Sequence, residues 1–75
     1  MERIKVNREK NEVVLSFNEK FYDKKFIDKA AEEFKEVCDV KKENNLIFLK
    51  PKEKIDINTL GYEFYNYVLD LIKNS

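Results

Sequence analysis

The chain has 75 residues, enough for one domain (residues 1–75) with a small core. Its 15 basic residues balance 15 acidic residues. A single cysteine excludes an internal disulfide and the usual zinc-ligand spacings. There is no apolar leader at the N-terminus, and no apolar run approaches the ~18 residues that a membrane span needs. We therefore predict a soluble, cytoplasmic protein with no role in a membrane.

The charged residues are unevenly chosen. Lysine supplies 13 of the 15 basic residues, and glutamate outnumbers aspartate ten to five. This enrichment in Lys and Glu is typical of heat-adapted proteins, whereas the eight asparagines, which are thermolabile, count against it. A thermophilic origin is a hypothesis that the Lys and Glu content favours.

The N-terminal part predicts a hairpin. Residues 3–6 and 13–17 each alternate apolar with other side chains, as strands do. The segment between them, residues 7–11, is polar and has asparagine at both ends, which suits a turn. Apolar side chains at 13, 15 and 17 would share one face of the second strand.

The first helix is predicted from its cap and its spacing. Asp23 suits the N-cap, where its carboxylate accepts hydrogen bonds from the first turn. Tyr22 and Ile27 flank it at the spacing of a hydrophobic staple. Apolar residues then recur at helical spacing over 26–37, and charged residues fill the other side, so an amphipathic surface helix is expected.

A second hairpin follows. Residues 38–40 resume the alternation, and residues 42–45 form a polar turn in which either asparagine tolerates a left-handed backbone. Residues 45–50 form an apolar strand that is expected to be central or covered on both sides. Pro51 ends it, because proline cannot donate to a ladder.

The last helix begins at an N-cap supplied by Asp56 or Asn58 and continues to about Lys73. The resulting element order is ββαββα with short connections. This order predicts an α+β fold, a two-layer sandwich in which an antiparallel sheet carries both helices on one face.

The last helix is more apolar than its position requires. One arc holds its expected core residues, Leu60, Phe64, Tyr67, Val68 and Leu71. A second arc beside it holds Tyr62, Tyr65, Leu69 and Ile72, although a helix lying on a sheet needs only one apolar stripe. Either the second arc packs against the first helix, or it forms an exposed patch that binds another chain. Gly61 weakens a helix, so we interpret it as a site where another backbone comes close.

Residues for catalysis are scarce. The chain has no histidine, and neither serine has a base to activate it. Cys38 is expected to be a small buried hydrophobic residue, with a reactive thiol as the alternative. Glu32, Glu33 and Glu36 have the spacing of a solvated helix face. A single glycine excludes a glycine-rich phosphate loop. We predict no enzyme activity, no cofactor, no metal and no small-molecule substrate.

A cluster of lysines is the only indication of nucleic-acid binding. Lys41, Lys42, Lys50, Lys52 and Lys54 give a locally positive segment that would suit an edge near phosphates. The alternative is ordinary solubilising charge around two strand ends. Phe48, the aromatic residue of this segment, is expected in the core, which leaves no ring for base stacking.

Two stretches resemble a known family. The segment FNEKFYDKKFIDKAAEEF resembles the opening of the small HxsD-like proteins, in which a strand leads through an aromatic–Tyr pair into a helix. LIFLKPKEKIDINTLGYEFYNYVLDLI resembles their second half, with residues 63–69 matching a Glu-Phe-x-Asn-x-x-Leu run. The resemblance spans residues 12–73. It implies an accessory protein of His-Xaa-Ser peptide systems, partner to a radical S-adenosylmethionine enzyme that modifies a peptide.

A second resemblance concerns layout only. The small Pcc1-like subunits of the tRNA-modifying KEOPS complex also combine a hairpin with helices and dimerise. Of the pattern in their last helix, only Asn66 corresponds here.

The sequence thus predicts a non-catalytic small accessory protein that binds another protein chain or a second copy of itself. The predicted contact surface comprises Gly61, Tyr62, Tyr65, Leu69 and Ile72. The alternative is a dimerising subunit of a tRNA-modifying complex, or an RNA-binding module, that uses the five lysines.

Overall fold

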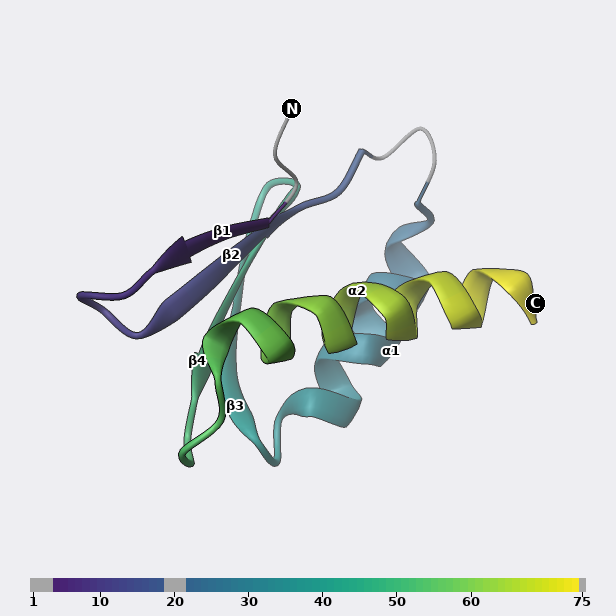
Figure 1. Ribbon diagram of the computed structural model, residues 1–75. Coiled ribbons are helices and arrows are strands. Elements are labelled where there is room, and N and C mark those ends of the chain that lie inside the picture. Colours follow the sequence, from purple (N-terminus) through teal and green to yellow (C-terminus); the bar gives the residue numbers. More distant parts are fainter. Residues whose placement is uncertain (1–3, 19–21, 75) are drawn as a thin grey trace.

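The computed structural model describes residues 4–18 and 22–74 (Figure 1). The elements follow the order β1 (Ile4–Asn7), β2 (Glu12–Ser16), α1 (Lys24–Phe34), β3 (Cys38–Glu43), β4 (Leu46–Pro51) and α2 (Ile57–Lys73). This confirms the predicted ββαββα order and the α+β class. The first predicted strand began at position 3, which lies outside the described residues.

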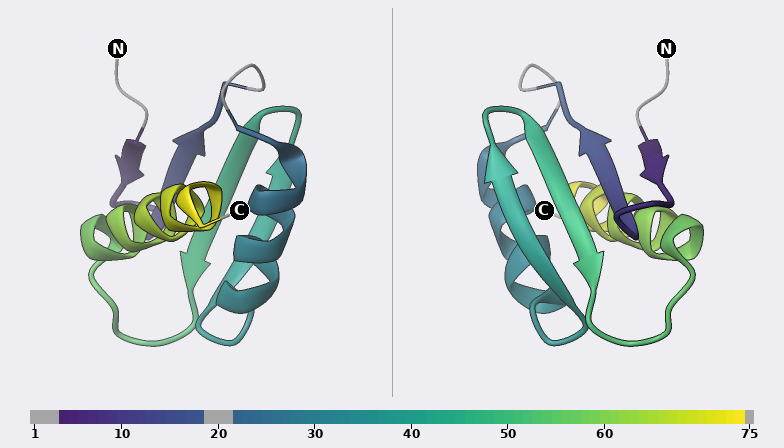
Figure 2. Two further views of the ribbon diagram at one scale, coloured as in Figure 1. Left: turned by 90° about the vertical axis from the view of Figure 1, so that its right-hand side faces the viewer. Right: turned by 90° about the vertical axis from the view of Figure 1, so that its left-hand side faces the viewer.

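The four strands form one antiparallel sheet in the order β1-β2-β4-β3. β4 is therefore central, as its apolar sequence predicted, and β1 and β3 are the edges. Figure 2 shows both helices on the same side of the sheet. The fold is thus a two-layer sandwich with one covered face and one open face.

Asparagine allows both hairpin turns. In the first, Asn7 pairs with Glu12, and Asn11 adopts a positive φ of 51°. In the second, Asn44 has a φ of 56° and only two residues separate the paired Glu43 and Leu46. Because this turn is so tight, residues 41–43 join the ladder, and β3 is longer than the predicted 38–40.

The helix caps agree with the chemistry of the sequence. The Asp23 carboxylate accepts a hydrogen bond from the Lys25 amide at 3.1 Å. Asp56, rather than Asn58, caps α2 and accepts from the Thr59 amide at 3.2 Å. α1 ends at Phe34, three residues before the predicted end, because the chain turns there to begin β3 at Cys38.

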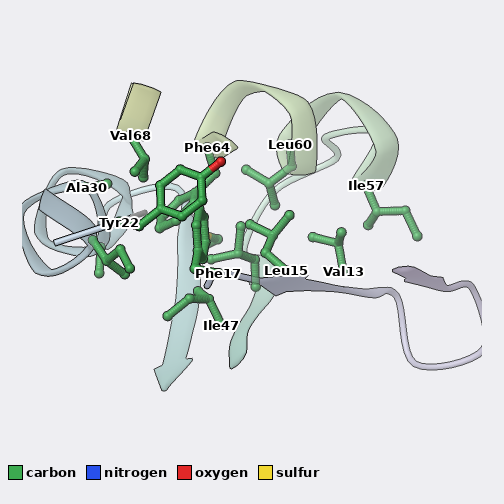
Figure 3. Close-up of a cluster of buried hydrophobic side chains, with 14 residues drawn as sticks. Val13, Leu15, Phe17, Tyr22, Ala30, Ile47, Ile57, Leu60, Phe64 and Val68 are labelled. Atoms are coloured by element: carbon green, nitrogen blue, oxygen red, sulfur yellow. The ribbon is translucent and has the colours of Figure 1, made fainter. Parts of the chain in front are cut away.

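The core lies between the covered face of the sheet and the helices (Figure 3). The sheet supplies Val13 and Leu15 of β2, Phe17 just after that strand, and Ile47 and Leu49 of β4. The buried helix residues are Ile27, Ala30 and Ala31 of α1 and Ile57, Leu60, Gly61, Phe64 and Val68 of α2. Among the described residues, no helix is long and apolar enough to cross a membrane.

Candidate functional site

The flank of α2 that carries Tyr67 contacts α1. The ring of Tyr67 meets the edge of Phe34 with centroids 5.8 Å apart, and Phe64 meets the same ring at 5.1 Å. Tyr67 belongs to the predicted core arc and is half-buried. The second arc, which was the candidate surface, lies on the other flank of α2.

Tyr65 is part of the fold. Its ring stacks on Phe17 with a centroid distance of 5.2 Å and an interplanar angle of 15°. Its hydroxyl lies 2.6 Å from the hydroxyl of Tyr22, the residue that precedes the cap of α1. Because this side chain already has two internal partners, its half-buried ring contributes only an edge to any outer surface.

Gly61 lies on the buried side of α2. A Cβ at this position would lie 2.9 Å from Cγ2 of Val13 and 3.1 Å from Cγ2 of Ile4. The close approach that the glycine permits is therefore between α2 and the sheet of the same chain. This corrects its predicted place in the contact surface with another chain.

Tyr62 remains the exposed member of the predicted set. It has 63% of its surface accessible and is the only large hydrophobic residue in this state among the described residues. Leu69, two turns further on, and Ile72 lie on the same flank and are half-buried. These three residues are called the α2 surface below.

The five lysines do not form one edge. Lys42 makes an ion pair with Asp28 of α1. Lys52 donates a hydrogen bond to the carbonyl oxygen of Lys35 at 2.9 Å and lies 3.9 Å from Asp39. Lys54 is exposed in the loop before α2. Of the five, only Lys41 and Lys50 project from the open face of the sheet, on β3 and β4.

Phe48 does not lie in the core, contrary to expectation. It pairs with Val14 on one side and Lys41 on the other, whereas its neighbours Ile47 and Leu49 are buried. Since side chains alternate along a strand, Phe48 projects from the open face, where it is half-buried. The sequence could not reveal this, because residues 46–49 are all apolar and either alternate set would suit the core.

Cys38 behaves as a buried side chain. It is completely covered, and its thiol donates a hydrogen bond to the carbonyl oxygen of Phe34 at 3.2 Å. Burial raises the pKa of this thiol above its ordinary value, and the neighbouring Asp39 adds to the effect, while Lys52 opposes it. The nucleophilic thiolate is disfavoured here, so this geometry gives the thiol little reactivity.

Residues 4–18 and 22–74 contain no group of three or more His, Cys, Asp or Glu side chains placed to hold a metal ion. A shallow hollow beside the first turn is lined by Lys5, Val6, Asn7, Arg8, Glu9 and Val14. It borders the open face of the sheet.

The structure therefore offers two separate candidate surfaces. One is the α2 surface on the helical layer, and the other is the open face of the sheet around Phe48. No family model, curated protein or solved structure matches this chain.

Proposed function

We propose that the protein is a non-catalytic accessory protein that binds another protein chain through the α2 surface. The observation that carries this proposal is the exposure of Tyr62, which is 63% accessible in the second turn of the 17-residue α2. Tyrosine is favoured at interfaces because its ring buries a large apolar area while its hydroxyl stays hydrogen-bonded.

The position of Tyr62 supports a role in binding, because the fold does not need an aromatic ring there. The neighbouring Glu63 and Asn66 show that polar side chains suit the outer side of this helix. Leu69 and Ile72 extend the apolar strip toward the C-terminal end of α2. A contact of this kind has an aromatic anchor with aliphatic residues beside it, which is the composition of energetically important interface positions.

The resemblance to HxsD-like proteins suggests the kind of partner. An accessory protein of that type would bind a peptide-modifying radical S-adenosylmethionine enzyme and hold or orient it or its peptide. A second copy of the chain is the other partner that the proposal includes. In either case the α2 surface is the contact.

Site-specific photocrosslinking tests the proposal. The photoreactive p-benzoylphenylalanine replaces Tyr62, and in a matched control it replaces Glu63, the next residue, which is exposed but lies on the polar stripe. We expect a discrete adduct in cells from position 62 and several-fold less from position 63. Adding Leu69→Gln to the protein that carries the photoreactive residue at position 62 should lower the yield.

Mass spectrometry of the adduct distinguishes a second copy from a different protein. Light scattering over a range of concentrations then checks the mass of the free protein. Equal yields from positions 62 and 63, or an adduct unaffected by Leu69→Gln, would contradict the proposal.

A further inference from the structure

The open face of the sheet has an ordered central row. The strand register places Lys5 of β1, Val14 of β2, Phe48 of β4 and Lys41 of β3 side by side across the four strands. All four belong to the alternate set that faces away from the helices. The row therefore has an apolar centre with one ammonium group at each end.

The apolar centre is wider than one residue. Leu46, two positions before Phe48 on β4, projects from the same face. The side chains of Val14, Leu46 and Phe48 are all half-buried. Neither helix covers this face (Figure 2). A half-buried aromatic ring with aliphatic neighbours on an uncovered sheet face is a surface on which a flat base can stack.

The charges on this face are sorted by row. The charged side chains in the central row are both lysines, Lys5 and Lys41. Acidic side chains occupy the two flanking rows. Asp39 pairs with Lys50, Glu43 pairs with Leu46, and Glu12 lies two residues before Val14 on β2. Asp39 also lies within 3.9 Å of the Lys52 ammonium group. A polyanion that crosses the strands along the central row would meet cations at both ends and acids only beside its path.

The hollow beside the first turn extends this path. Lys5 and Val14 belong both to the central row and to the wall of the hollow, and Arg8 lines it further along. Glu9 lines it as well. The end of the row at β1 therefore has two basic side chains, one of them a guanidinium group suited to binding phosphate.

A second copy of the chain fits this face less well. A two-fold axis parallel to the strands through the centre of the face would set Lys5 over Lys41 of the other copy. An axis across the strands would set each of these lysines over its own equivalent. Because like charges in direct contact oppose association, the central row favours an anionic partner.

We infer that the open face binds a single-stranded nucleic acid that crosses the strands, with a base stacked on Phe48 and its phosphates at Lys41 and Lys5. This surface lies on the opposite layer from α2, so it is independent of the proposed protein contact. A duplex does not fit the same role, because its bases are already stacked on each other and cannot lie on the ring.

Fluorescence anisotropy with a labelled octauridylate and the matched octathymidylate tests this inference. We expect saturable binding that weakens as salt rises, because phosphate contacts release counterions. A preference for octauridylate would assign RNA, whereas equal affinity would assign single strands in general. Both results support the inference, and the matched RNA duplex should compete poorly.

Variants locate the binding site. Phe48→Leu keeps an apolar side chain but removes the ring, and we expect it to lower the affinity about tenfold, in line with the loss of one stacked base. Lys41→Gln and Lys5→Gln should each weaken binding and make its salt dependence less steep. Lys29→Gln, an exposed lysine of α1, is the matched control and should change neither.

Circular dichroism would show whether Phe48→Leu folds. If it folds poorly, Lys41→Gln and Lys5→Gln still test whether the open face binds the oligonucleotide. Absence of binding to both oligonucleotides at low salt would overturn the inference. It would also be overturned if Lys29→Gln weakened binding as much as Lys41→Gln. A dimer in solution that Phe48→Leu dissociates would assign this face to a second copy instead, which also overturns it.

Discussion

α1 and α2 each follow a hairpin and lie on the same face of the sheet, but they divide their surfaces differently. α1 has 11 residues, buries mainly small side chains such as Ala30 and Ala31, and presents charged residues outside. α2 has 17 residues and buries the large Leu60 and Phe64, yet it also carries the exposed Tyr62. The comparison separates apolar residues that are buried in the core, such as Leu60 and Phe64, from an apolar residue that the core does not use, Tyr62.

The difference follows from where each helix lies. α1 packs near the β3 edge, and its alanines are buried. α2 lies over β1 and β2, where Gly61 brings its backbone close to Val13 and Ile4. On its flank away from Tyr67, Tyr65 contacts the rings of Phe17 and Tyr22, and Leu69 and Ile72 pack in part against the core. Tyr62 on that flank is exposed, with 63% of its surface accessible.

The largest expected effect tests the buried side of α2. Phe64→Ala removes a fully buried ring that contacts Phe17 and Phe34, and we expect a loss of about 3–5 kcal/mol in the free energy of unfolding. Urea unfolding followed by circular dichroism measures it. The half-buried Phe34→Ala is the comparison on α1 and should cost less. An equal cost would mean that the two helices contribute to the core alike.

The next effect concerns the close approach of α2 to the sheet. Gly61→Ala improves helix propensity, but its methyl group would overlap Val13, so we expect a net loss of about 1–3 kcal/mol in stability. The same change in a Val13→Ala background should cost clearly less, because the overlapping methyl is gone. A stabilising effect in the natural background would show that the sheet can yield at this point.

A smaller effect distinguishes the two tyrosines on the flank of α2. Tyr65→Phe removes one hydroxyl of the pair formed with Tyr22, and we expect a loss of about 1 kcal/mol. Tyr62→Phe is the matched control and should leave stability unchanged. A double-mutant cycle with Tyr22→Phe isolates the interaction of the two hydroxyls. Zero coupling in that cycle would mean that the two hydroxyls do not stabilise the fold and that Tyr65 contributes through its ring alone.

The smallest effect is the pH dependence from Cys38. Its pKa in the folded protein is raised above the ordinary value of 9.0, so the folded state holds the proton more tightly than the unfolded state. The contribution of the neutral thiol is complete below pH 9.0 and is lost as pH rises through the raised pKa. Thermal melts should therefore show that the natural protein loses stability relative to Cys38→Ala as the pH rises above 9.0. Parallel pH profiles for the two proteins would contradict this.

Local signals in the sequence predicted the elements well. Asp23 and Asp56 act as caps in the structure, and Asn11 and Asn44 take the left-handed turn positions that asparagine tolerates. These are interactions within a few residues, so residue type and spacing are sufficient. Errors occurred at the end of α1 and in the length of β3, where pairing with β4 decides the boundary.

The candidate surfaces were predicted less completely. Tyr62 lies exposed on the helix flank that the second arc indicated. Gly61, however, faces the sheet, and Tyr65 packs against Phe17 and Tyr22. The partners of these residues lie more than forty positions away in the chain, and helix periodicity contains no information about such contacts. Phe48 was misplaced for a similar reason, since its strand is apolar on both faces.

The sequence by itself determined the class of this protein: a ββαββα chain of alternating strands and amphipathic helices, with an apolar surplus on the last helix and few groups for catalysis. Hydrophobic periodicity and capping chemistry act locally, and they are sufficient for that result. Only the tertiary structure decided which surplus residues remain accessible, and that Lys5, Phe48 and Lys41 stand in one row. Strand order and register set those positions, and both depend on pairing between distant segments.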